Sequence, residues 1–117
     1  MSASHSLAEG TVFVVNVIHA QPGKQEAALS IIREIVHYVA DRRKEFLWST
    51  LATSVDGQTV VNIEAITGPG DVEAFFSDAT FADKFKRLNE IGRYEFHVYR
   101  ARDLILPRCE QTGVRCA

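Results

Sequence analysis

The sequence predicts an α+β fold in which two helices cover one face of an antiparallel sheet. Two runs rich in β-branched and apolar residues, Thr11 to Ala20 and Thr59 to Thr67, have the composition of central strands. Lys24 to about Arg43 instead repeats apolar residues at helical spacing. With the elements described below, the order is strand, helix, strand, strand, helix, strand. That order is typical of a ferredoxin-like βαββαβ domain with a four-stranded antiparallel sheet.

The first half of the chain contains clear turn signals between these elements. Gln21-Pro22-Gly23 separates the first strand from the long helix. Phe46 to Val55 alternates as a second strand, and Asp56-Gly57 is a strong signal for a hairpin into the third. The apolar stripe of the long helix predicts the core that lies under the sheet, and it consists of Ala28, Ile31, Ile32, Ile35 and Val39.

The second half predicts a broken helix and a last strand. The helical pattern falls into two pieces, Asp71 to Ser77 and Thr80 to about Asn89, and Gly92 is expected to end it as the C′ residue. Arg93 to about Ala101 alternates as a strand. We therefore expect a flexible leader over 1–10, a folded domain over 11–103, and a C-terminal arm and tail over 104–117.

Composition excludes several classes of protein. A chain of 117 residues with a formal net charge of −2 and dispersed Lys and Arg predicts one domain that does not bind nucleic acid. No apolar run reaches the roughly 18 residues of a membrane span, and the N-terminus lacks a signal-peptide pattern. A cytoplasmic protein is expected. Cys109 and Cys116 are best interpreted as free thiols, although a disulfide closing a small loop in the tail stays open.

Polar side chains within the central strands predict a cavity. Asn62 and Glu64 lie two apart and therefore share a face with Ile66. Because buried polar groups are costly without partners, we expect this face to line a wet cavity opposite the helices. An apolar sheet face of this kind requires a cover, and a second copy of the chain is the simplest one. The other residues expected on the face are Asn16, Ile18, Phe46 and Trp48.

Several segments resemble the antibiotic-biosynthesis monooxygenase family, whose members are dimeric α+β barrels. The resemblance spans about Val12 to Asp103. It rests on the strand and turn from Asn16 to Gly23, the strand and hairpin from Phe46 to Gly57, the segment Glu73-Ala74-Phe75-Phe76 with the following Ser77 to Phe81, and Val98-Tyr99-Arg100.

The resemblance implies a homodimer that oxygenates an electron-rich aromatic compound with O2, in natural-product biosynthesis and without metal, flavin or haem. Polyketide-like anthrones and quinols are typical substrates of the family. Asn62 matches an asparagine that lines the family's pocket, whereas Ile66 stands at a tryptophan position. In the haem-degrading branch an asparagine matches Asn16, but Phe85 stands where that branch has its iron-binding histidine. Haem degradation is therefore not expected.

The residues themselves suggest roles for these positions. An amide can donate to an oxyanion, so Asn62 and Asn16 are candidate catalytic residues, with His97 as a candidate base. Glu64 is either a general base of raised pKa or one half of an ion pair at the rim. Paired structural amides and phenylalanines packed in the core are the alternative interpretations. The candidate substrate-binding residues are Trp48, Glu64, Ile66, Phe76, Phe85 and Tyr99.

Two other functions remain open at the level of sequence. The same barrel could fold a polyketide as a cyclase or isomerase, moving protons without oxygen. It could also bind a ligand without catalysis. Oxygen consumption with an anthrone or quinol would separate the first function from the other two.

Overall fold

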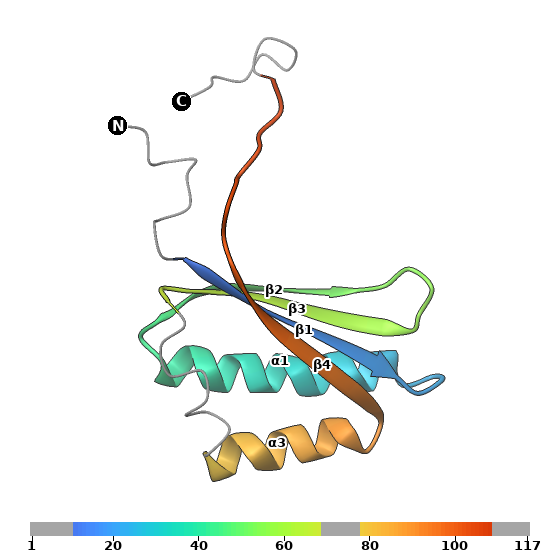
Figure 1. Ribbon diagram of the computed structural model, residues 1–117. Helices are drawn as coiled ribbons and strands as arrows, with labels where there is room; N and C mark the ends of the chain where they lie inside the picture. The colour runs from blue at the N-terminus through green and yellow to red at the C-terminus, as the bar shows by residue number, and fades with distance from the viewer. Residues whose placement is uncertain (1–10, 69–77, 109–117) are drawn as a thin grey trace.

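The computed structural model describes residues 11–68 and 78–108, which form one four-stranded antiparallel sheet and two helices. The strand order is β2-β3-β1-β4, and both helices lie against the same face of the sheet (Figure 1). This arrangement confirms the predicted α+β, ferredoxin-like fold. The elements are β1 (Val12–Ala20), α1 (Gln25–Arg42), β2 (Phe46–Thr53), β3 (Thr59–Ile66), α3 (Ala79–Asn89) and β4 (Gly92–Arg100).

The turns and helix ends follow mostly from local chemistry. Gly23 and Gly57 have φ of 78° and 80°, a conformation that glycine adopts without strain, in the two turns predicted from sequence. Asp78 caps α3 by accepting hydrogen bonds from the backbone N–H groups of Thr80 and Phe81. The first predicted piece of this helical segment, residues 71–77, lies outside the described residues.

The prediction that Gly92 ends the second helix is wrong. The helix ends at Asn89, and Gly92 is instead the first residue of β4, paired with Ala20 of β1. A Cβ atom at this position would lie 2.5 Å from the carbonyl oxygen of His19. The glycine therefore permits close approach of two strands rather than a left-handed helix end.

The main core lies between the sheet and the helices. Ile32 of α1, Leu88 of α3, and Ile18 and Val60 of the central strands have no exposed surface. Apolar residues at helical spacing on α1 pack against side chains that alternate along β1 and β3, as the two periodicities require. The core therefore fixes which face of each strand points toward the helices.

This packing shows that the predicted assignment of sheet faces is wrong. Ile18 and Val60 belong to the helix-side core, so Asn16 and Asn62, two residues away on their strands, also face the helices. Glu64 and Ile66 follow them on the same side. The polar side chains of Asn62 and Glu64 had suggested that this face of the sheet lay opposite the helices. Alternation shows which residues share a face but not which face the helices cover.

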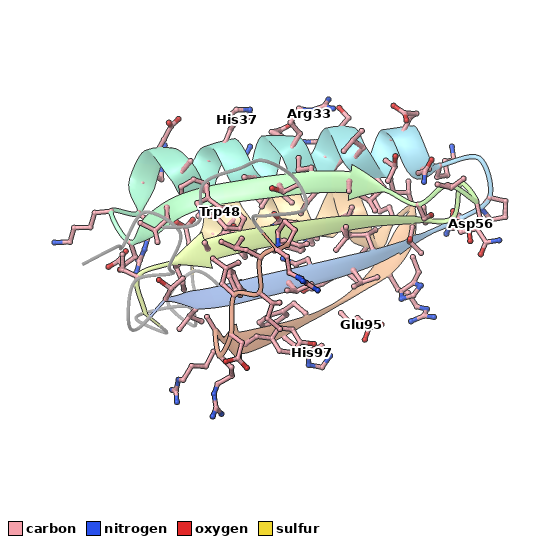
Figure 2. The ribbon with its side chains drawn as sticks, turned by 90° about the horizontal axis from the view of Figure 1, so that it is seen from above. Arg33, His37, Trp48, Asp56, Glu95 and His97 are labelled. Atoms are coloured by element: carbon pink, nitrogen blue, oxygen red, sulfur yellow. The ribbon has the colours of Figure 1, made fainter. Side chains whose placement is uncertain are left out.

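A bulge in β2 separates two aromatic residues that were expected on one face. Phe46 pairs with Ile66 and packs against the helix-side core, whereas Trp48 pairs with Ala65. The extra residue between these two pairs reverses the alternation. Trp48 therefore points away from the helices and contacts Phe13, with ring centroids 5.9 Å apart (Figure 2).

The sheet face opposite the helices, here called the open face, is largely apolar. Phe13, Val15 and Val17 of β1 and Val61 and Ile63 of β3 are partly exposed on it. Residues 101–108 leave β4 and extend away from the sheet on this same side (Figure 1). Within the described parts of the chain, no helix is both long and apolar enough to cross a membrane.

Candidate functional site

The two central strands place two amides side by side beneath the sheet. Asn16 of β1 is the direct pairing partner of Asn62 of β3. Their exposed fractions are 8% and 2%, so both lie in the helix-side interior. Directly paired residues of antiparallel strands have Cβ atoms about 5 Å apart, within reach of one small ligand group. The predicted juxtaposition of these amides on adjacent strands is therefore observed, on the side of the sheet that the helices cover.

The amides separate two apolar clusters. Along β1, Val14 belongs to a small cluster with Val12 and Ile66, whereas Ile18 belongs to the main core. Asn16 lies between them. Along β3, Val60 belongs to the main core and Ile66 to the small cluster, with Asn62 and Glu64 between. Polar residues thus interrupt the interior at the same level on both strands.

A hydrogen-bonded chain fixes the orientation of Asn62. The hydroxyl of Ser49 on β2 donates to Oδ1 of Asn62. The amide nitrogen then lies at the opposite end of the side chain. Asn62 donates a hydrogen bond to the Glu64 carboxylate, and this bond lowers the pKa of Glu64 because it favours the ionised form. Three strand residues therefore form one ordered polar group, which we call the Ser49–Asn62–Glu64 chain.

Burial makes Glu64 an unusually basic carboxylate. Removal from water raises the pKa of Glu64 above its ordinary value, and the hydrogen bond from Asn62 opposes part of that rise. No charged side chain among the described residues contributes to the shift. The alternative expectation of an ion pair at the rim therefore finds no support among the described residues of the protomer. A carboxylate in this setting is a stronger proton acceptor than an exposed one.

Asn16 is the second interior amide, and 8% of its surface is exposed. The structure records no side-chain hydrogen bond from Asn16 to a described residue. No fully buried side-chain nitrogen or oxygen in the described segments lacks a partner. Within the described residues, the amide of Asn16 is therefore not committed to a partner, which leaves it available to a bound molecule.

The candidate residues divide between the two faces of the sheet. Asn16, Asn62, Glu64 and Ile66 share the helix side, which Phe85 of α3 also faces. Phe85 packs between Phe81 and Tyr94, with ring centroids 4.8 and 4.6 Å away, as a core phenylalanine does. Phe76 lies outside the described residues. The remaining candidates, Trp48, His97 and Tyr99, lie on the open face.

His97 belongs to a cluster on the open face. It lies beside Tyr99, as predicted from their alternation, with ring centroids 6.1 Å apart. Glu95 lies 3.0 Å from Nε2 of His19 and 3.6 Å from Nε2 of His97 (Figure 2). The hydrogen bond with His19 is the main reason that the pKa of Glu95 is lowered. The sheet thus lies between His97 and the two asparagines, and His97 cannot share one bound molecule with them within a protomer.

Sequence reasoning missed the contribution of Ser49. Ser49 lies between Trp48 and Thr50 in the sequence, where a serine in an alternating strand gives no sign of a special role. The useful signal was the pairing of β2 with β3, which brings Ser49 opposite Glu64. Across residues 11–68 and 78–108, no three His, Cys, Asp or Glu side chains gather in an arrangement suited to a metal ion.

Comparisons with solved structures identify proteins of the same fold. An asparagine-to-alanine mutant of SnoaB, a cofactor-independent oxygenase from Streptomyces nogalater, superposes with a TM-score of 0.72 at 20% identity, covering 82% of this chain and 97% of that one. A monooxygenase from the gene ActVA-Orf6 of Streptomyces coelicolor, solved with the ligand nanaomycin D, gives 0.68 at 24% identity, covering 86% and 94%.

The same fold also occurs in a conserved protein from Methanosarcina mazei, with a TM-score of 0.67 at 14% identity, covering 79% of this chain and 93% of that one. No protein-family model matches the sequence. No curated protein matches it either. The resemblance predicted from the sequence is therefore confirmed at the level of the fold, among whose members are Streptomyces oxygenases.

Proposed function

We propose that this protein is a cofactor-independent monooxygenase that acts on a polyketide-like aromatic substrate, an anthrone or quinol, in natural-product biosynthesis. The observation that carries the proposal is the pair Asn16 and Asn62, held side by side in the interior between two apolar clusters. An aromatic substrate needs apolar contacts for its rings and a few placed polar groups for its oxygens. The fold shared with two Streptomyces oxygenases supports the same function.

The chemistry requires little from the protein beyond binding and charge stabilisation. An anthrone that loses a proton from its methylene carbon becomes an enolate, an electron-rich anion able to reduce O2 itself. The overall change converts the methylene group and O2 into a carbonyl group and water, with all four electrons that reduce O2 taken from the substrate. Amide N–H groups directed at the enolate oxygen stabilise the charge that forms there.

Asn62 is the residue on which the proposal is best tested. Asn62→Ala should lower kcat/KM for oxygen consumption with an anthrone by roughly 10- to 1000-fold, the range for losing one oxyanion donor. Asn16→Ala should act in the same direction. Asn89→Ala, on the exposed last turn of α3, is the matched control and should leave turnover unchanged. Unchanged turnover in a folded Asn62→Ala variant would show that the amides are structural.

A polyketide cyclase or isomerase is the second candidate, because the Ser49–Asn62–Glu64 chain can move a proton without oxygen. Product formation under strictly anaerobic conditions would favour it over oxygenation. Stoichiometric binding of aromatic compounds with no product in air or under nitrogen would instead indicate a ligand-binding protein. Purified protein that carries stoichiometric metal, flavin or haem would contradict the cofactor-independent chemistry.

A further inference from the structure

Glu64 is the ionisable member of the interior polar group, and its neighbours on the adjacent strands are uncharged. Val14 of β1 and Ser49 of β2 are its direct pairing partners. Ile66, the next residue of β3 on the same side, belongs to the small apolar cluster with Phe96. No charged group from the described parts of β1, β2, β4, α1 or α3 perturbs the pKa of Glu64. Among the described residues, burial and the hydrogen bond from Asn62 therefore set the pKa of this carboxylate.

Ser49 determines which end of the Asn62 amide faces this carboxylate. Because the Ser49 hydroxyl donates to Oδ1, the amide nitrogen is directed to the other side. The amide nitrogen has two hydrogens, and one of them makes the hydrogen bond to Glu64. The second hydrogen can serve a substrate oxygen beside the carboxylate. A donor and a proton acceptor are thus held one hydrogen bond apart.

From this geometry we infer that Glu64 is the general base of the site, Asn62 binds the oxyanion that forms, and Ser49 is a positioning residue that keeps the amide nitrogen between them. The inference rests on the proposed function for the choice of substrate. It adds to that function the identity of the residue that accepts the proton.

The proton transfer is balanced without an oxidant. The carbon–hydrogen bond of the anthrone methylene breaks, and the proton goes to a carboxylate oxygen of Glu64. The electron pair of that bond enters the conjugated system and places negative charge on the substrate oxygen near Asn62. The protein changes only from carboxylate to carboxylic acid. This step precedes oxygen and can be observed in its absence.

The test uses 1,8-dihydroxyanthrone with the full-length protein under nitrogen. The wild type should convert the bound anthrone to its enolate, whose longer conjugation absorbs at longer wavelength than the keto form. Glu64→Gln keeps the shape and the hydrogen-bond acceptor but cannot take the proton, so the rate of enolate formation should fall by roughly 100-fold or more. Glu90→Gln, at the exposed end of α3, is the matched control and should match the wild type.

A Glu64→Gln rate within about threefold of the wild type would overturn the inference, and so would a wild type that forms no enolate at saturating anthrone. Oxygen uptake separates this outcome from the proposed function. Enolate that forms through Glu64 but consumes no oxygen in air would support the base and reject oxygenation. Oxygen uptake that persists in Glu64→Gln would reject the base and support oxygenation.

Ser49 is tested by the pH dependence of the same step. The rate should decline at low pH as Glu64 becomes protonated. In Ser49→Ala the amide is released and can turn its carbonyl oxygen toward the carboxylate, which favours the protonated acid and should move this decline to higher pH. Ser49→Thr retains the hydroxyl and should restore the wild-type profile. A Ser49→Ala variant with lower thermal stability but an unmoved profile would show that the residue has no positioning role.

Discussion

At the scale of single residues, the interior carboxylate should reduce stability at neutral pH. Burial raises the pKa of Glu64 in the folded protein above its value in the unfolded chain. A group with this shift stabilises the fold at pH values below its unfolded pKa, and that contribution is lost as pH rises through the folded pKa. Near pH 7 the ionised side chain is therefore unfavourable.

Glu64→Gln should accordingly raise the melting temperature at pH 7 by a few degrees, because the neutral amide avoids this cost and still accepts the hydrogen bond from Asn62. The gain should shrink as pH falls toward 4. Thermal unfolding of the variant, the wild type and Glu90→Gln at one protein concentration is the measurement. A gain that is the same at every pH would contradict the burial argument.

The residues of the site could be predicted only in part. Asn16 and Asn62 stood out because polar side chains are rare within apolar strands, and the strand order brought them together as expected. Ser49 could not be recognised in the same way. A serine in a half-exposed strand is ordinary, and its role depends on a register between β2 and β3 that local sequence does not determine.

At the scale of elements, β1 and β4 approach each other too closely for a side chain at Gly92. Gly92→Ala would place a Cβ atom 2.5 Å from the backbone oxygen of His19, and backbone atoms cannot move aside as a side chain can. We expect a loss of about 1–3 kcal/mol in the free energy of unfolding, as for other overpacked sites. Urea unfolding measures this loss.

Gly68→Ala is the control for Gly92, since a Cβ atom there would have no neighbour within 4 Å among the residues that the structure describes. It should change the free energy of unfolding by less than about 1 kcal/mol. If the two substitutions changed the free energy of unfolding equally, β1 and β4 would be able to move apart at Gly92 without loss of stability. The sequence alone suggested a helix end at Gly92, because a glycine after a helix is usually a cap and a close approach between strands has no local signal.

The strands and helices themselves could be predicted well, whereas their orientation could not. The boundaries of α1 and β3 lie within one residue of those expected, since periodicity and turn residues are local properties. Which face of the sheet meets the helices is decided by packing of residues such as Ile18 and Val60. The bulge between Phe46 and Trp48 could not be predicted either, because a bulge is defined by the pairing of β2 with β3 and not by the sequence of β2 alone.

At the scale of the whole molecule, the open face predicts a homodimer. Trp48 and Tyr99 are 43% and 50% exposed on this face, and Ile105 in the segment beyond β4 is 87% exposed. Burying such a surface against a second copy should cover more than about 1,000 Å² in total. Light scattering should give twice the chain mass of 13.1 kDa at micromolar concentration.

Ile63→Lys should dissociate this dimer. The side chain lies on the open face between Val15 and Thr50, where a lysine would be desolvated by a partner. His37→Lys adds a similar charge on the outer side of α1 and is the matched control (Figure 2). A monomeric wild type, or an Ile63→Lys variant that remains a dimer, would show that the open face is not the interface.

The alternation of β1 and β3 limits how the gene for such a protein can change. Odd and even positions of each strand belong to different surfaces, the helix-side site and the open face. Adding or deleting one codon within a strand would exchange the two surfaces beyond that point, since the side-chain period is two. Substitutions can therefore alter either surface independently, whereas changes in length should be tolerated mainly in turns such as Asp56-Gly57.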